Sequence, residues 1–578
     1  MAKNIKILRA HKLLVAIFLL AVLLRFYKLG QIPNGFDGDE VASGYYSFSL
    51  IHNLSDEYGN KLPLYFPSIG DYKYPVYAYL STLPVFIFGL AEFSTRFLSA
   101  LAGSLLTIFL YLLVLETTQN KKIAVFSSIL IAISPYSILF SRGAYESNLA
   151  TTLLVVGFWW LLRCLNNKKE NNIYFSLILF ILAIFTYPSI RVFLLLFLPV
   201  FFLIYRQKSK PLGKLIGIIV LVILISFLNP KSLVRAKDIG FLKDKLPLTQ
   251  VETLIREDGY VWNGKNLIIT RIFHNKIVLF SLNIAKRYFE HFNPVYLFLE
   301  GNPNLPKYSV PGVGLFYFFE AVAILLGLIF LTKVNKKAGL FFLFWILISV
   351  IPSSLTIETP NPIRTLIGLP AWEVICAIGL WRIIEAVPNK YKRTAFVLFA
   401  LVGFTHLAYF WHQYSLHKLI HQPWYSDVGV KEMVLEVKKL ENDYNKIVIS
   451  KDPYIFFLFY NKVKPKDFIR SSDIIPEEIG IWERVNSFGK IIFKMPMDCP
   501  KIGRLNVLYI CRGGEILINS KLIKVIYFND RVPAFNLIEF VPLSKAPAEI
   551  LPENVHRMVE SDSNYPEGIF SEGSGRYW

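Results

Sequence analysis

Cysteine and charged residues are both scarce in this sequence. Four cysteines among 578 residues are too few for a disulfide scaffold, and none has the spacing of a zinc finger. Charged residues make up 18% of the chain, whereas a soluble globular protein has roughly 25%. Because 54% of the residues are also hydrophobic, the composition excludes an ordinary cytosolic enzyme, a disordered protein and a coiled coil. It predicts a membrane protein.

Acidic residues are fewer than basic ones. The 62 Lys and Arg residues outnumber the 42 Asp and Glu residues, which gives a formal net charge of +20. In a membrane protein, such an excess usually lies in cytoplasmic loops that face anionic lipid. We therefore expect membrane lipid as a partner and no nucleic acid.

Apolar runs of membrane-spanning length recur along the chain. The first ends at Arg25 and follows a basic N-terminal segment; no small-residue cleavage site comes after it, so we interpret it as an uncleaved signal anchor with its N-terminus inside. Further runs lie near residues 97–115, 123–140, 149–163, 172–188, 192–206, 213–228, 314–332, 338–355, 366–384 and 394–411.

The short apolar segment 76–90, which contains Pro84, decides the topology. If it lies along the outer interface without spanning, every inner loop is basic, as the positive-inside rule requires. These inner loops are residues 121–122, 163–170, 205–214, 333–337 and 382–393. We therefore predict a polytopic α-helical protein of the cell membrane with about eleven spans, its N-terminus inside and its C-terminus outside.

This topology divides the chain into two domains. Residues 1–411 form the transmembrane domain, with extracytoplasmic loops at 28–96 and 229–313. The tail, 412–578, changes composition: short apolar stretches at 446–450, 490–495, 506–511, 524–528 and 536–540 are typical of buried strands, and 428–442 of a helix. We expect an extracytoplasmic α/β domain there. It contains Cys499 and Cys511, whose pairing the sequence leaves open.

Unusual polar residues gather at the expected outer ends of spans. Asp37, Asp39 and Glu40 follow the first span and suggest a general base or a cation site; a solvated helix N-terminus is the plain alternative. Lys73 precedes the interfacial segment, where it can snorkel or hold a phosphate.

Further cations end other spans. Arg142 and Glu146 are four residues apart, which also fits an internal ion pair, and Tyr187 and Arg191 follow a later span. Arg364 comes after prolines 360 and 362, which fix an extended turn. Together, these residues form one carboxylate cluster and up to four cations. Such a set suits a reaction at an anionic lipid headgroup, in which a carboxylate deprotonates the attacking group. A snorkelling role stays open for Arg191.

The order of these features resembles that of the GT-C type membrane glycosyltransferases, in particular the branch of protein O-mannosyltransferases and aminoarabinose transferases. The resemblance covers residues 13–410. Its segments are Asp39–Glu40, KYPVYAYL (73–80), EFSTRFLSALAGSLLTIFLYLL (92–113), YFEHFNPVYLFLEGN (288–302), VPGVG (310–314) and IPSSLTIETPNPIRTL (351–366). Tyr74 replaces the first of two prolines, and Tyr72 replaces a glutamate that can serve a metal. A divalent cation therefore stays an open expectation.

The resemblance implies a hexosyl- or pentosyltransferase that takes a polyprenyl-phosphate-linked sugar at the extracytoplasmic face and passes it, with inversion, to an unknown acceptor (protein, lipid or glycan). A phosphate leaves as an anion, so one base is enough, whereas a glycosidase needs a second carboxyl group. We assign Asp39 as that base, with Glu40 positioning it or the acceptor. The expected phosphate-binding residues are Lys73, Arg142, Arg191 and Arg364.

We expect substrate contacts from Tyr187, Glu146 and the loop 229–313, where Tyr288 and His291 lie in an aromatic stretch suited to stacking on a sugar; a packed histidine is the plain alternative for His291. A transporter or flippase of lipid-linked glycans is the main rival. It predicts ionisable residues near the bilayer midplane and broken spans in both halves of the chain. A polymerase or ligase that transfers whole glycans is not separable from a single-sugar transferase by sequence.

Overall fold

The computed structural model describes residues 2–68, 71–167, 170–205, 210–234, 240–262, 267–450, 454–475, 485–495, 500, 503–513 and 519–541. The chain forms two compact units. The helical unit comprises Met1–Asp56 and Asn60–Ser426, and the sheet unit comprises Glu57–Gly59 and Asp427–Trp578. The division falls after Ser426, later than the expected boundary at 411, because helix α21 continues to Ser415.

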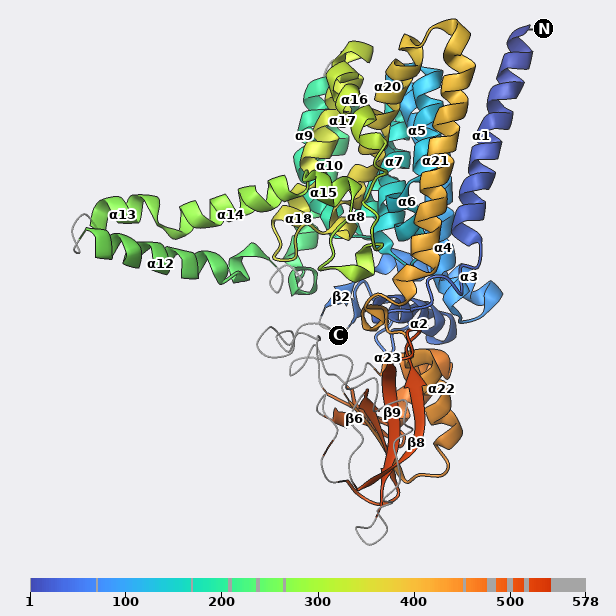
Figure 1. Cartoon of the computed structure of the whole chain (residues 1–578), viewed down its shortest axis with the longest axis vertical. Helices are drawn as coiled ribbons and strands as arrows, with labels where there is room; N and C mark the ends of the chain where they lie inside the picture. The colour runs from blue at the N-terminus through green and yellow to red at the C-terminus, as the bar shows by residue number, and fades with distance from the viewer. Residues whose placement is uncertain are drawn as a thin grey trace. The chain divides into compact units, whose positions relative to one another are not determined.

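Each apolar run of the sequence is helical. The helices are α1 (Ala2–Phe26), α4 (Glu92–Thr118), α5 (Lys121–Ile133), α6 (Pro135–Ser141), α7 (Glu146–Asn166), α8 (Tyr174–Ile184), α9 (Ser189–Tyr205), α10 (Lys210–Leu228), α16 (Glu320–Val334), α17 (Lys336–Ser349), α20 (Leu369–Ala386) and α21 (Lys392–Ser415). Most of them run side by side in a bundle (Figure 1). Helices suit the apolar interior of a membrane because they satisfy all backbone polar groups within the segment.

Seven helices of the described residues are long and apolar enough to cross a membrane, or eight if the bent pair α5–α6 counts as one span. The chain is therefore an integral membrane protein. Helix α3 (Pro75–Phe88) has only 14 residues and contains Pro84, so it is shorter than a span, as expected for an interfacial segment. The total of eleven spans and the inside position of the N-terminus stay predictions.

A buried arginine compensates for the break between α5 and α6, which are bent by 54°. Pro135 has no N–H, so the carbonyl of Ile131 lacks its intrahelical partner. Arg25, which is fully buried, donates to the carbonyls of Ile131 and Ala132 at 3.0 Å each. This cation therefore supports the helix break.

Most of the loop 229–313 forms a helical hairpin of α12 (Leu246–Val261), α13 (Leu267–Phe273) and α14 (Lys276–Glu290). Figure 1 shows that it extends away from the bundle, across the direction of the spans. The substrate contacts expected from this loop stay a prediction. After α15 (Pro294–Phe298), residues 299–313 return to the bundle and bring Lys307 to the cluster described below.

The sheet unit contains a mixed seven-stranded sheet in the order β4-β5-β6-β3-β7-β9-β8, with β3 parallel to both β6 and β7. The strands are β3 (Lys446–Ser450), β4 (Ser472–Ile474), β5 (Val485–Phe488), β6 (Ile491–Met495), β7 (Val507–Arg512), β8 (Ser520–Tyr527) and β9 (Pro533–Phe540), with helices α22 (Val430–Leu440), α23 (Ile455–Tyr460) and α24 (Pro465–Ser471). The five predicted strands and the predicted helix are confirmed, whereas β4 and β5 were not predicted. Cys511 is disulfide-bonded, and Cys499 lies outside the described residues.

Candidate active site

Three carboxylates surround the start of α2 (Gly38–Asn53). Asp37 is the N-cap residue, and its Oδ1 accepts from the backbone N–H groups of Asp39 and Glu40 at 2.9 and 3.2 Å. Acidic residues are favoured here because the helix dipole places positive partial charge at the N-terminus. The plain alternative from sequence, a helix N-terminus, therefore explains the local conformation. It does not explain the cations that meet these carboxylates.

Glu40 is held by a buried arginine. Arg96, on α4, donates from Nε and Nη2 to Oε1 and Oε2 of Glu40 at 2.8 Å each, and the backbone N–H of Ala144 donates to Oε1 at 2.7 Å. Both side chains of the ion pair are almost fully buried. Such a two-point pair is strong and directional. Glu40 therefore ties α2 to α4 and to the loop before α7.

Asp39 differs from its two neighbours because it lies between two lysines and stays open to solvent. Lys73 Nζ is 2.7 Å from Asp39 Oδ1, and Lys307 Nζ is 3.0 Å from Oδ2. The Asp39 side chain is 43% exposed, against 6% for Asp37 and 4% for Glu40. Of the three carboxylates, Asp39 is thus the one that an external reactant reaches.

Lys307 joins the carboxylates to one another. Its Nζ also lies 2.9 Å from Asp37 Oδ1. Burial by itself would lower the pKa of Lys307, but Asp37 and Asp39 hold that pKa well above its usual value. Burial raises the pKa of Asp37, and the Lys307 ammonium opposes this rise. The ammonium is therefore retained because it has two carboxylate partners.

Lys418 fixes the loop that carries Lys307. Its Nζ donates to the carbonyls of Pro306, Lys307 and Ser309 at 2.8, 3.2 and 2.7 Å. A small pocket opens at this place, and its polar lining includes Asp37, Glu40, Tyr145, Lys307, Tyr414 and Lys418. The carboxylates, two of the cations and this pocket therefore share one place in the helical unit.

Arg191, on α9, lies in a separate group of aromatic side chains. Its guanidinium carbon is 4.5 Å from the ring centre of Tyr74 and 5.6 Å from that of Phe227. The side chain is buried, and its Nε and Nη2 atoms have no hydrogen-bond partner among the described residues. Lys231 lies 5.1 Å from the ring centre of Tyr72. A buried guanidinium with unsatisfied donors is costly unless an acceptor is supplied.

The strand β2 (Tyr72–Lys73), with Tyr74 directly after it, connects the two groups. Lys73 contacts Asp39, whereas Tyr72 and Tyr74 pack together with Tyr65. Neighbouring side chains of an extended segment point to opposite faces. The acidic cluster and the Arg191 group therefore lie on the two faces of the same short segment, β2 with Tyr74.

Arg142 faces the end of α1 instead of a cavity. Its Nη1 donates to the carbonyls of Leu24 and Arg25 at 2.8 and 3.0 Å, and its Nη2 to those of Tyr27 and Ile32 at 2.8 Å each. The last carbonyls of a helix have no intrahelical partners. Arg142 supplies hydrogen-bond donors to these carbonyls. This arrangement favours a structural role over the phosphate-binding role expected from sequence.

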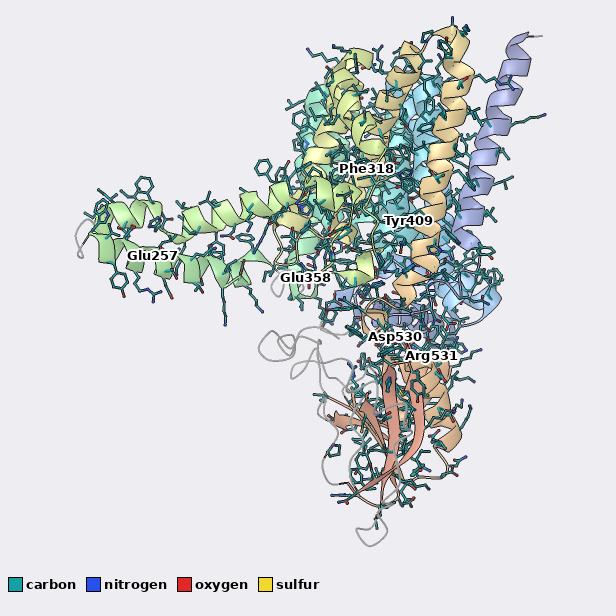
Figure 2. All side chains as sticks on the ribbon, viewed as in Figure 1. Glu257, Phe318, Glu358, Tyr409, Asp530 and Arg531 are labelled. Carbon is teal, nitrogen blue, oxygen red and sulfur yellow. The ribbon has the colours of Figure 1, made fainter. Side chains whose placement is uncertain are left out.

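Arg364 is paired within its own turn. Its Nη2 is 2.7 Å from Glu358 Oε2, and its Nη1 donates to Thr356 Oγ1 at 2.7 Å and to the Glu358 carbonyl at 2.9 Å. Glu358 lies at the end of the bundle from which the helical hairpin extends (Figure 2). The phosphate-binding role expected for Arg364 stays a prediction.

The expected substrate-binding residues are dispersed. His291 is buried, with Nδ1 2.7 Å from the Arg287 carbonyl and Nε2 2.8 Å from Ser353 Oγ, as the packed alternative predicts. Tyr288 Oη donates to the Leu347 carbonyl at 3.0 Å. Glu146 is buried at the first position of α7, and Tyr187 is buried in the bundle core. The roles proposed for these four residues stay predictions.

Sequence reasoning missed three residues of the cluster, namely Arg96, Lys307 and Lys418. Lys307 stands between two segments that carry the resemblance, 288–302 and 310–314, and this position is the signal that could have found it. Arg96 lies inside a third such segment, 92–113. Lys418 has no comparable signal, because it acts only on backbone carbonyls.

A divalent cation stays an open expectation at this site. Within the part of the chain that the structure describes, no group of three or more His, Cys, Asp or Glu side chains is arranged to hold a metal ion. The nearest carboxylates, Asp37, Asp39 and Glu40, already meet Lys307, Lys73 and Arg96. The chemistry proposed below therefore uses no metal.

Comparison with known proteins adds the family context. Residues 72–229, which carry Lys73, Arg142 and Arg191, match the family model of dolichyl-phosphate-mannose-protein mannosyltransferase. The resemblance to the GT-C glycosyltransferases is confirmed. No curated protein sequence matches the chain at a significant level.

Among solved structures, an oligosaccharyltransferase and ArnT match part of the fold. The oligosaccharyltransferase of Archaeoglobus fulgidus, tethered to an acceptor peptide, is 16% identical, with a TM-score of 0.45 over 78% of this chain; the match spans 63% of that enzyme's length. ArnT from Cupriavidus metallidurans bound to undecaprenyl phosphate is 13% identical, with a TM-score of 0.48 over 78% of this chain and 84% of ArnT. The apo form of ArnT is 12% identical, with a TM-score of 0.44 over 80% of this chain and 86% of ArnT.

Proposed function

We propose that the protein is an inverting glycosyltransferase that moves a sugar from a polyprenyl-phosphate donor to an acceptor at the outer face of the membrane. The observation that carries the proposal is Asp39, a solvent-accessible carboxylate between two lysines beside a pocket. Its two neighbouring carboxylates are buried and tied to the protein. The basic loops that the positive-inside rule places in the cytoplasm support the outer position of this site.

Asp39 acts as the general base. A base must reach the acceptor proton directly or through one water, and the exposure of Asp39 permits this. The acceptor hydroxyl or amine transfers its proton to Asp39 as its oxygen or nitrogen bonds to the anomeric carbon. The bond from that carbon to the phosphate oxygen breaks on the opposite side, which inverts the centre, and the lipid phosphate leaves as an anion. Glu40 keeps α2 in place through Arg96.

Arg191 and Lys73 bind the donor phosphate in this proposal, each from its own face of β2 with Tyr74, so the phosphate lies at the edge of that segment. The unsatisfied Nε and Nη2 of Arg191 supply donors for phosphate oxygens, and planar guanidinium groups suit such oxygens. The Lys73 ammonium contacts Asp39. A phosphate that attracts the Lys73 ammonium would weaken this contact and make Asp39 a better base. Stabilisation of the leaving charge by one such donor is worth about 3–4 kcal/mol.

Transport is the less supported function. It predicts ionisable residues near the bilayer midplane and broken spans in both halves of the chain. Among the described residues, the buried acids of α16 and α20 are Glu320 and Glu373; Glu320 begins α16, whereas Glu373 lies near the middle of the candidate span Pro362–Ala386. Within the described ranges, one bent helix pair, α5–α6, is long and apolar enough to be a broken span.

The test follows donor consumption. Purified protein is incubated with a panel of polyprenyl-phosphate sugars and native membranes, and wild type is compared with Asp39→Asn. Asp530→Asn is the matched control, because Asp530 is an exposed turn residue of the sheet unit (Figure 2). We expect consumption to be lost in Asp39→Asn, with donor binding retained, and to be unchanged in the control. Consumption that persists in Asp39→Asn would remove Asp39 as the base. A donor that neither form binds or consumes would overturn the proposal in favour of transport.

A further inference from the structure

The helical hairpin of α12, α13 and α14 presents two different faces. Its base is anchored to the bundle, because Tyr288 Oη donates to the Leu347 carbonyl on α17, and the pair of Arg287 with Asp244 joins α14 to the residues just before α12. Beyond that base the helices extend across the direction of the spans (Figure 1). The hairpin therefore exposes side chains that the bundle does not cover.

The surface of α13 and α14 is strongly apolar. Ile268, Ile272 and Ile277 are 77%, 59% and 80% exposed, and Phe289 is 68% exposed. Ile269, Phe273 and Leu282 add to the same surface. Seven large apolar side chains in such contact with water form a larger patch than soluble surfaces usually carry. This surface needs an apolar partner.

The exposed surface in the middle of α12 is polar, whereas Leu246, Tyr260 and Val261 at its two ends are exposed apolar residues. Its exposed residues include Thr249, Glu252, Arg256 and Glu257, and Figure 2 shows Glu257 on this helix. The opposite side of α12 faces α14, where the Asn283 amide donates to Gln250 Oε1 at 3.0 Å. The hairpin is thus a two-layer element, with mainly polar exposed residues along the middle of α12 and mainly apolar exposed residues on α13 and α14.

The apolar layer lies on the side of the hairpin where the membrane-spanning helices extend. In Figure 1, α13 and α14 lie on the side of α12 toward the spans of the bundle. The exposed apolar residues of α10, such as Leu221, Leu224 and Leu228, belong to a candidate span and precede the hairpin in the chain. The apolar layer therefore continues the lipid-facing surface of the bundle.

We propose that the hairpin lies in the plane of the membrane, with α13 and α14 inserted into the adjacent lipid leaflet and α12 at the water surface. Helices with one apolar and one charged side bind bilayers in this way. The exposed cations of the inserted layer, Arg271, Lys276 and Lys286, can reach lipid phosphates as snorkelling side chains. The partner of this surface is thus the lipid bilayer. The proposal does not depend on the glycosyltransferase assignment.

Two other arrangements are less consistent with the residues of the hairpin. Residues 268–298 pass the composition criterion for a span, but a span would place Lys276, Lys286 and Glu290 in hydrocarbon, where charged residues are costly. A second copy of the chain could cover the apolar layer instead. In-plane insertion places α12 at the water surface and α14 in lipid. Neither of the two other arrangements does so.

Spin-label accessibility in the full-length protein, reconstituted in phosphatidylethanolamine and phosphatidylglycerol bilayers, tests the proposal. Single cysteines are placed at Ile272 and Leu282 on the apolar layer, at Glu257 on α12 and at Leu221 on α10 as the lipid reference. The unsubstituted protein gives the background, since Cys164 and Cys376 are free but buried. We expect labels at 272 and 282 to resemble the label at 221, with high collision rates for oxygen and low rates for a water-soluble nickel chelate, and the label at 257 to show the reverse.

Three outcomes overturn the proposal. Nickel accessibility at 272 and 282 equal to that at 257 would mean that the hairpin stays in water. Exclusion of both reagents at 272 and 282, with dipolar broadening between labels, would indicate a second copy on the apolar layer. Oxygen accessibility at 257 equal to that at 221 would indicate that α12 is also embedded in the bilayer.

Discussion

Replacement of Lys307 with methionine tests the electrostatic design of the carboxylate cluster. The change keeps much of the side-chain volume but removes the ammonium that contacts Asp37 and Asp39 at 2.9 and 3.0 Å. Loss of one partner of a buried ion pair typically costs about 3–5 kcal/mol. The Asp37 side chain is 6% exposed, so it becomes a nearly uncompensated buried charge, whereas Asp39 keeps Lys73 and solvent. We expect a loss of stability near the lower end of this range at neutral pH, because protonation of Asp37 limits the cost.

The pH dependence of the loss identifies its cause. Without Lys307, burial and the neighbouring carboxylates Glu40 and Asp39 raise the folded-state pKa of Asp37 above the unfolded value. An acid of this kind destabilises the fold when it is ionised, so the deficit relative to wild type is full above the folded pKa and disappears as the pH falls to the unfolded value. The assay is thermal unfolding of the purified protein in detergent from acid to mildly alkaline pH. The double variant Lys307→Met with Asp37→Asn should recover stability and lose the extra pH dependence.

The control is Lys438→Met, because Lys438 is an exposed lysine on α22 of the sheet unit. It should unfold like wild type at every pH. A Lys307→Met deficit that is the same at all pH values, or that the Asp37→Asn change does not relieve, would refute the reasoning. The loss would then come from packing of the loop at Lys307 and not from the charge of Asp37.

Two arginines predicted to bind phosphate should respond differently. Arg142→Lys should lower stability by about 2 kcal/mol or more, since hydrogen bonds to charged groups are worth about 1.5–3 kcal/mol and one ammonium cannot reach all four carbonyls; Arg393→Lys, at an exposed position, is the control in thermal unfolding. Full stability with lost donor binding would restore the phosphate role of Arg142. Arg191→Met should keep stability but weaken binding of a polyprenyl phosphate by about 10-fold or more, equal to about 1.4 kcal/mol, measured by titration, whereas Arg364→Ala should weaken it less. Equal effects at both positions would contradict this division.

Much of the fold follows from local sequence. Each apolar run became a helix because backbone groups in an apolar environment must bond within their own segment, and α22 and five of the strands lie where their patterns predicted them. Strands β4 and β5 have only three and four residues and lack a long apolar alternation. The helical hairpin was not predicted, although the sequence of α14 has the 3.6-residue periodicity of a helix.

The candidate site was predictable where the chemistry is local. Asp39 and Glu40 are adjacent, and Lys73 precedes a recognisable segment, so their meeting followed from the expected topology. The arginines were not predictable in this way. A guanidinium can serve a phosphate, a carboxylate or backbone carbonyls equally well, and the sequence does not record which of these stands opposite it.

The sequence by itself determined the membrane class, the placement of the helices, the family resemblance and the acidic start of α2, because each depends on composition or on residues close together in the chain. Only the tertiary structure decided that Arg142 supports the end of α1, that Arg191 is buried with unsatisfied donors, and that Lys307 bridges Asp37 and Asp39 across some 270 positions of chain. The role of a charged side chain depends on the groups that surround it in space, and long-range packing chooses those groups.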